Sequence, residues 1–314
     1  MPVISSGIPK HIRQAEMPVV YFRYAGIITI HFFRVTNGAI YAVIAVGFSM
    51  LYNATELINF AHGEFVMLGA LGFVSLWGGL HLPLPLAFVL TVGGVSFVGF
   101  LFERLAIRTV SKPHPIVLVI ITVGASIFLR GIAMIGWGKD AYSVPPFSES
   151  NPLDVAGARL LPQSLWIVGI ALLMVVLLWF FYQKTLTGKA MLATAISKRA
   201  AWITGIPAEK MILLAFIISS GLGAVAGIII APITMCSYDM GTMLGLKGFC
   251  AAMLGGIGSL WGALIGGFLL GILEALGVGF FSSAIKDAIA FILLLTILYV
   301  RPSGIIGSGE SSRF

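Results

Sequence analysis

Residues 164–183 read SLWIVGIALLMVVLLWFFYQ, an uncharged and strongly apolar run. A helix needs about 20 such residues to cross the hydrocarbon core of a bilayer, and this run has that length. Comparable segments recur at about 35–52, 58–80, 84–107, 114–137, 211–232, 240–257, 258–279 and 284–300. The sequence therefore predicts an all-α fold, a polytopic membrane helix bundle with about 8–9 spans.

The segment at 240–257 is the weakest of these candidate spans. It contains Lys247, and glycines bracket it. A short or re-entrant helix is therefore the alternative to a full span. Such broken elements occur at membrane depth only where protein or a cavity surrounds them.

The composition also indicates a membrane protein. Only 31 of the 314 residues are charged (19 Lys and Arg, 12 Asp and Glu), which is 10%, and 59% are hydrophobic. Ordinary soluble domains carry about 25% charged residues, because their surface must be largely polar. These values exclude soluble enzymes, nucleic-acid binders, disordered regulators and disulfide scaffolds. The net charge of +7 fits Lys and Arg in cytoplasmic loops and does not indicate nucleic acid.

Loop charges orient the chain in the membrane. The linker 184–210 has one acid, Glu209, against the basic residues Lys184, Lys189, Lys198, Arg199 and Lys210. This linker and the basic linker 103–113 should therefore be cytoplasmic, and the Pro- and Ser-rich linker 138–162 should be outside. The C-terminus should be inside, which requires 240–257 to cross. Counting spans places the N-terminus outside, whereas its basic residues favour the inside, and an irregular extra element at about 18–33 would reconcile the two.

Small residues recur at helical spacing in two spans. One set is Ser219, Gly223 and Gly227, and the other is Gly258, Gly262, Gly266, Gly267 and Gly271. Small residues spaced by four let helices approach closely. They predict close helix packing and do not indicate a particular substrate.

Ionisable groups inside apolar spans are costly, so each is a candidate functional residue. The richest cluster is Asn59, His62 and Glu64. Asn59 and His62 would share a helical face, whereas Glu64 would point about 200° away from His62 on a regular helix. A break at Gly63 would let all three face one cavity. The alternative is that neighbouring helices satisfy these groups, which then only fix the fold.

Lys247 and Glu274 are the other candidate buried charges. They could form an ion pair, and a structural role is favoured over a chemical one because buried ions usually pair. Cys236 and Cys250 lie in apolar surroundings and indicate buried thiols, not a disulfide or metal site. The chain has no Walker-type loop and no hydrolase motif, so we expect no enzyme and no ATPase site in it.

The linker 184–210 has helical composition, a basic face and Gly205 placed as a stop. It predicts a short amphipathic helix on the cytoplasmic side. From composition alone, this helix could lie on the lipid surface or dock into another protein.

Several longer motifs occur in a fixed order along the chain. They are NGAIYA (37–42), AVGFSMLY (45–52), INFAHGEFVMLGA (58–70), AAMLGGIGS (251–259), GALIGG (262–267), KD (286–287) and RPSGIIG (301–307). In order and spacing these motifs resemble the permease subunits of branched-chain amino acid ABC importers. The NFAHGE form resembles the shorter of the two homologous permeases in such importers.

The resemblance implies a multi-pass pore half in the bacterial cell inner membrane. Its implied partners are a second homologous permease (a heterodimer), two cytoplasmic ATP-binding subunits, a periplasmic substrate-binding protein and membrane lipid, with no nucleic acid. ATP would be bound by the partner subunits, and no cofactor is expected in this chain. The implied substrates are leucine, isoleucine and valine, with urea, short amides or other amino acids as alternatives.

The resemblance also divides the chain. It covers a permease domain at 36–307, preceded by an irregular extension at 1–35 and followed by a tail at 308–314. Within the linker, it implies ATPase-coupling roles for Ala193, Ala195, Lys198, Arg199, Ala201 and Gly205. The sequence departs from the family pattern at Ile196 and Ser197.

The leading hypothesis is ATP-driven import by alternating access, with Asn59, His62 and Glu64 as candidate polar residues of the translocation path. A second is a stand-alone secondary transporter or channel, in which His62, Glu64 and Glu274 couple ions and two inverted halves are expected. A structural scaffold or membrane receptor, the third class, predicts no flux.

Overall fold

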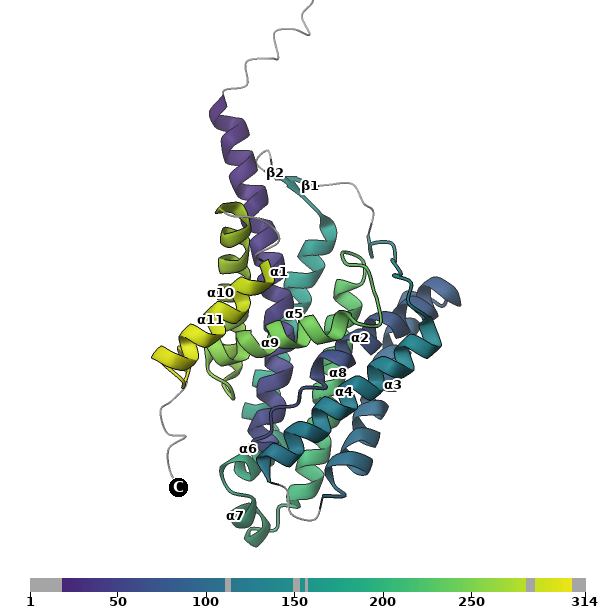
Figure 1. Ribbon diagram of the computed structural model, residues 1–314, viewed down its shortest axis with the longest axis vertical. Coiled ribbons are helices and arrows are strands. Elements are labelled where there is room, and N and C mark those ends of the chain that lie inside the picture. Colours follow the sequence, from purple (N-terminus) through teal and green to yellow (C-terminus); the bar gives the residue numbers. More distant parts are fainter. Residues whose placement is uncertain (1–18, 111–113, 149–152, 156–157, 281–285, 307–314) are drawn as a thin grey trace, which may run out of the picture.

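The computed structural model describes residues 19–110, 114–148, 153–155, 158–280 and 286–306, which form a helical bundle (Figure 1). In chain order its helices are α1 (Val19–Thr55), α2 (His62–Phe73), the π-helix η2 (Val74–Gly79), α3 (Leu84–Phe102), the π-helix η3 (Glu103–Ile107), α4 (Pro115–Trp137), α5 (Pro162–Lys184), α6 (Leu186–Ile196), α7 (Lys198–Ile203), α8 (Ala208–Ile230), α9 (Met240–Gly255), α10 (Leu260–Phe280) and α11 (Lys286–Val300). Strands β1 (Leu153–Val155) and β2 (Ala158–Leu160) form a small antiparallel hairpin. The sequence did not predict this hairpin because its strands are only three residues long.

Within the described residues, six helices are long and apolar enough to cross a membrane. They are Val35–Thr55, Leu84–Ile107, Pro115–Trp137, Pro162–Lys184, Ala208–Ile230 and Leu260–Val278. The prediction of an all-α polytopic bundle is thus confirmed. In the three other apolar segments, α2 has 12 residues and continues into the six-residue η2, α9 has 16 residues and α11 has 15. At 1.5 Å per residue, α9 is about 24 Å long, shorter than the ~30 Å hydrocarbon core.

Helix α9 and the turns that flank it link two parts of the bundle. Before it, the backbone of Cys236 pairs with that of Tyr142 in the linker expected outside. After it, Gly258 and Ser259 line a groove of about 750 Å³ together with Ile196 of α6. Figure 1 shows α9 running across α1 instead of along it. The segment 240–257 is therefore a short transverse helix.

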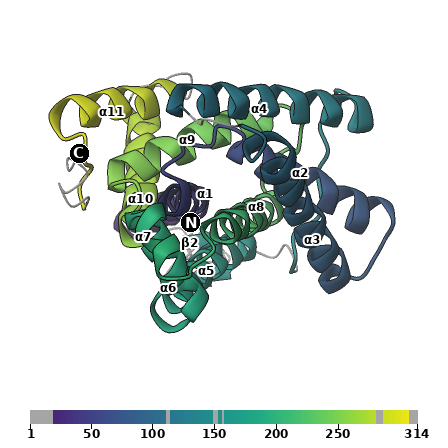
Figure 2. The same cartoon turned by 90° about the horizontal axis from the view of Figure 1, so that it is seen from below.

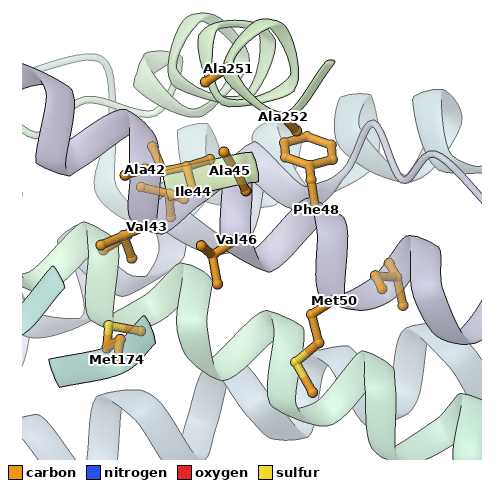
Figure 3. Close-up of a cluster of buried hydrophobic side chains, with 14 of the residues drawn as sticks. Ala42, Val43, Ile44, Ala45, Val46, Phe48, Met50, Met174, Ala251 and Ala252 are labelled. Carbon is orange, nitrogen blue, oxygen red and sulfur yellow. The ribbon is translucent and has the colours of Figure 1, made fainter. Parts of the chain in front are cut away.

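Helix α1 forms the centre of the bundle. In its most apolar stretch 83% of the residues are buried, against 17% in α4. It packs against α5, α8, α9 and α10. Figure 3 shows Ile44 and Phe48 of α1 beside Ala251 and Ala252 of α9. The most buried span is thus the first one in the chain.

Helix α1 also begins earlier than the sequence suggested. Residues 19–35 continue it as regular helix, where an irregular extension was expected. The start of α1 lies at the end of the bundle that carries the β-hairpin, opposite α6 and α7 (Figure 1). This placement agrees with the outside position that counting spans predicts for the start of the chain. It does not agree with the inside position that the basic residues favour. Residues 1–18 and the expected tail at 308–314 lie outside the described residues.

Glycines allow α10 to lie directly against its neighbours. A Cβ at Gly266 would lie 2.1 Å from the carbonyl oxygen of Ala251 in α9. A Cβ at Gly267 would lie 2.3 Å from the backbone nitrogen of Ala42 in α1, and one at Gly262 would also meet α9 backbone. These contacts leave no room for a side chain, so α10 is wedged between α9 and α1 by backbone contact.

Two glycines of the same predicted set have different surroundings. Gly258 is not in a helix: it lies in the turn between α9 and α10 with a φ of +91°, which glycine adopts without strain. Gly271 is buried within α10. On α8, Gly227 meets the carbonyl oxygen of Val66, so α2 lies equally close to α8.

Candidate functional site

The predicted span 58–80 is broken at its start. Helix α1 ends at Thr55 and α2 begins only at His62, so the chain between them is not helical. Local bonds shape this stretch: the Asn59 side chain accepts from the Ala61 N–H at 3.0 Å, and the Asn59 carbonyl accepts from the His62 N–H. Short Asx-type bonds of this kind compete with helix formation.

The broken stretch returns into the bundle before α2 starts. His62 packs against Gly47, which lies more than two turns before the end of α1: a Cβ on Gly47 would lie 2.4 Å from His62 Nε2. Non-helical backbone at this depth must be satisfied by protein or by a cavity. The Phe60 N–H of this stretch donates to the Thr122 hydroxyl of α4 at 3.3 Å.

His62 points toward α1 and α8. Its ring is fully buried, its Nδ1 lies 3.3 Å from the Ser219 hydroxyl, and it packs edge-on against Phe48 with 4.6 Å between ring centres. The Ser219 hydroxyl itself donates to the Gly47 carbonyl at 3.0 Å. These contacts place His62 inside the helix packing.

Glu64 points the other way, toward α4 and α9. Its Oε1 accepts from the hydroxyls of Ser126 at 2.8 Å and Thr242 at 3.1 Å. Its Oε2 lies against Gly241 and has no hydrogen-bond partner among the described residues. Gly63 does not turn the cluster toward one cavity, because it packs directly on the backbone of α9. Asn59, His62 and Glu64 are therefore all buried but do not converge.

The sequence reasoning missed Arg130. This cation lies within the span α4 and is half-buried. Its Nη1 donates to the Thr242 hydroxyl at 3.0 Å, which links it to Glu64 through one shared hydroxyl. The available signal was the polar series Thr122, Ser126 and Arg130, spaced by four residues in an otherwise apolar helix.

Lys247 and Glu274 lie in contact. Lys247 Nζ is 2.5 Å from Glu274 Oε1 and 2.7 Å from Asp287 Oδ1, and the Tyr41 hydroxyl donates to Glu274 Oε2 at 2.5 Å. The side chains of Lys247 and Glu274 are only 5% and 1% exposed. The network joins α1, α9, α10 and α11. Asp287, in the first turn of α11, is part of it.

The linker 184–210 forms two helices, so the prediction of one helix was wrong. The Ser197 side chain accepts from the Ala200 N–H and caps α7, which separates it from α6. Gly205 ends α7 with a φ of +83°. Lys198 and Arg199 are exposed.

The remaining coupling candidates differ in exposure. Ala193 and Ala195 are half-buried, whereas Ala201 is buried. Large apolar side chains next to them are uncovered: Ile196 is 87%, Trp202 74% and Ile203 73% exposed. An apolar patch of this kind usually marks a contact with protein or lipid.

Comparisons with known proteins fit this architecture. A family model for the branched-chain amino acid transport system / permease component matches residues 31–298. The high-affinity branched-chain amino acid transport system permease protein LivH of Salmonella typhimurium is 32% identical over 291 residues, which cover 88% of this chain and 94% of LivH. Its counterpart BraD of Pseudomonas aeruginosa is 33% identical over 288 residues, with the same shares covered.

Two further proteins are more distant. The ribose import permease protein RbsC of Escherichia coli is 28% identical over 198 residues, which cover 57% of this chain and 59% of RbsC. The solved structure of PsaBC from Streptococcus pneumoniae in complex with Fab matches 91% of this chain and 97% of its own, with a TM-score of 0.50 and 13% identity. That likeness concerns the fold alone.

Proposed function

Because the chain belongs to the family of branched-chain amino acid transport system permease components, we propose that it is the membrane-spanning permease of a binding-protein-dependent ABC importer. In this role it carries leucine, isoleucine and valine across the bacterial cell inner membrane by alternating access. The observation that carries the proposal is similarity to LivH and BraD along 94% of their length. The family is one of transport permeases, not of enzymes.

The proposed partners include two cytoplasmic ATP-binding subunits, which bind the ATP. Helices α6 and α7 support this assignment, since Ile196, Trp202 and Ile203 are exposed beside the cations Lys198 and Arg199. A patch that combines apolar anchors with a basic rim suits protein docking. We assign α7 and the end of α6 as the ATPase-docking surface.

A second homologous permease and a periplasmic substrate-binding protein complete the proposed assembly. Helices α3, α4 and α5 present mostly exposed apolar side chains: no more than 28% of their most apolar stretches is buried. Such surfaces face lipid or a partner helix. In the proposed heterodimer, part of this surface contacts the second permease and the rest contacts lipid.

The test is uptake of radiolabelled leucine into proteoliposomes that contain this chain with all proposed partners. Uptake should require ATP and the binding protein and should stop when the ATP-binding subunits are omitted. Uptake that persists without those subunits would contradict the proposal and support a stand-alone secondary transporter. If the complete set of proteins gives no uptake, the result would support a role of this chain as a scaffold or receptor.

The substrate class is tested in the same system. RbsC is named for ribose import, so related permeases serve different small polar molecules. Urea and short amides, the alternatives that the sequence resemblance implies, are the competing cargo in the proposal. Leucine, valine, urea and acetamide offered in parallel should give uptake of the two amino acids alone.

A further inference from the structure

Helix α4 buries polar side chains while many of its large apolar ones are exposed. Ile120, Ile127 and Phe128 are 64%, 57% and 67% exposed. Thr122 and Ser126, by contrast, are buried and face the start of α2. A span packed by apolar contact would show the opposite pattern. Helix α4 lies at the edge of the bundle, beside α2 and α9 (Figure 2).

Hydrogen bonds hold α4 at three levels along one stripe. The Thr122 hydroxyl accepts a hydrogen bond from the Phe60 N–H of the broken stretch. Ser126 donates to Glu64 of α2, and Arg130 donates to Thr242 of α9. Polar side chains within a membrane line a water-filled path or pair with one another. Substrate sites of transporters lie where non-helical backbone enters the membrane, as it does here in the broken stretch before α2. The seam between α4 and the α2/α9 layer combines both features.

Arg130 and Glu64 retain unused hydrogen-bonding capacity in this seam. The guanidinium has five N–H donors, but its side chain makes one hydrogen bond, to Thr242, and has no carboxylate within ion-pair distance among the described residues. Glu64 Oε2 is buried and lacks a partner among those residues. A free α-amino acid carries the complementary groups, a carboxylate that suits the arginine fork and an ammonium that suits a carboxylate.

We propose that this seam binds the α-carboxylate and α-ammonium of the transported amino acid, with Arg130 contacting the carboxylate and Glu64 the ammonium. In this structure the seam is closed by the hydroxyls of Ser126 and Thr242. Binding requires α4 to move outward, which exchanges these two bonds for bonds to the substrate. The inference rests on the proposed function and names the site within it.

The rest of α9 continues the path for an aliphatic side chain. Thr242, Leu246, Phe249 and Met253 share one face of α9 and are all half-buried. Phe249 also packs against Phe60 of the broken stretch, with 5.8 Å between ring centres. The stripe ends at Met253, which lines the 750 Å³ groove beside α6. It therefore leads from the charged groups to the cytoplasmic end.

One test removes each charge in the complete transporter. Glu64→Gln and Arg130→Gln should each lower ATP-dependent leucine uptake about ten- to a hundredfold, the range expected for losing a charge-assisted hydrogen bond. The amount of leucine taken up per ATP hydrolysed should fall in both variants, because Glu64 and Arg130 contact the substrate and lie outside the ATPase-docking surface of α6 and α7. Arg130→Lys keeps the charge without the fork and should retain more uptake than Arg130→Gln.

A second test does not depend on those variants folding well. In a chain with Cys236→Ser and Cys250→Ser, Ser126→Cys is compared with Ile127→Cys, the next residue on the outer face of α4. A charged, water-soluble methanethiosulfonate should modify Ser126→Cys at least about tenfold faster during turnover, because only the seam opens to water. Excess leucine held in the seam should slow this modification.

The outcomes separate the site from the function. Suppose that wild-type uptake depends on ATP but the two cysteines are labelled equally, or leucine gives no protection. This result would contradict the proposed site but not the proposed import function. Loss of uptake together with loss of stimulated ATP hydrolysis in properly folded Glu64→Gln would assign the seam to helix packing alone and overturn it as well. If the wild-type assembly does not transport, the proposed function itself is wrong.

Discussion

Replacing Lys247 by methionine should destabilise the protein strongly. Lys247 lies 2.5 Å from Glu274, and these two side chains are only 5% and 1% exposed. The substitution leaves Glu274 as a buried carboxylate, and among the described residues its remaining donor is the Tyr41 hydroxyl. Breaking a buried pair from one side costs about 3–5 kcal/mol. The Asp287 side chain is 51% exposed, so Asp287→Asn should cost only about 0–1 kcal/mol.

The chain carries its own reporter for this measurement. Cys236 and Cys250 are both fully buried, so a thiol-reactive fluorescent dye gives a signal only when the protein unfolds. At about 2–4 °C per kcal/mol, Lys247→Met should lower the unfolding temperature of the purified protein in detergent by about 6–20 °C. Asp287→Asn should lower it by less than about 4 °C.

A double variant provides the control. Lys247→Met combined with Glu274→Gln removes both charges, and a neutral replacement of a buried pair is often close to neutral in stability. The double variant should therefore recover most of the loss. The reasoning is refuted if Lys247→Met unfolds at the wild-type temperature, or if the double variant is no more stable than the single one.

Three further outcomes are expected. Gly266→Val should prevent correct folding, because a Cβ there meets backbone at 2.1 Å, whereas Gly124→Ala has open space and should fold; detergent-solubilised yield distinguishes them. Trp202→Glu should leave the unfolding temperature unchanged, since Trp202 is 74% exposed, but should reduce co-purification of the ATP-binding subunits. Burial raises the pKa of the Cys236 thiol to about 11, above its unfolded value of about 8.5. Stability should therefore fall as pH rises from about 8.5 to 11, and native Cys236 should resist maleimide at pH 8, as mass spectrometry would detect.

The sequence predicted where apolar helices occur better than how each one is built. The length and apolar character of residues 164–183 were sufficient to predict a membrane-spanning helix there, and α5 covers that run. The break before His62 was not predicted, because an Asx-type bond at Asn59 and a hydroxyl from Thr122, far along the chain, decide it. Ser197 separates α6 from α7 by the same kind of short side-chain bond.

The candidate site was predicted in part. Burial of Glu64 and its contact with other helices follow from the cost of a charge in lipid, but its direction depends on where α2 starts. Without knowing that α2 starts at His62, the sequence could not show that His62 and Glu64 point toward different helices. Arg130 was missed because a single cation in an apolar span is a weaker signal than a cluster of polar residues. Its spacing of four residues from Ser126 and eight from Thr122 does place the three on one helical face.

The central position of α1 has a consequence for how the protein is made. Tyr41 of α1 bonds to Glu274, which is 233 residues later in the chain. At ~5–20 residues per second, a ribosome needs about 10–50 s to supply that partner. During this time the first span to enter the membrane lacks its main neighbour and must be sheltered by the insertion machinery or by lipid. Chains truncated before α10 should therefore be short-lived in the cell, however apolar their spans are.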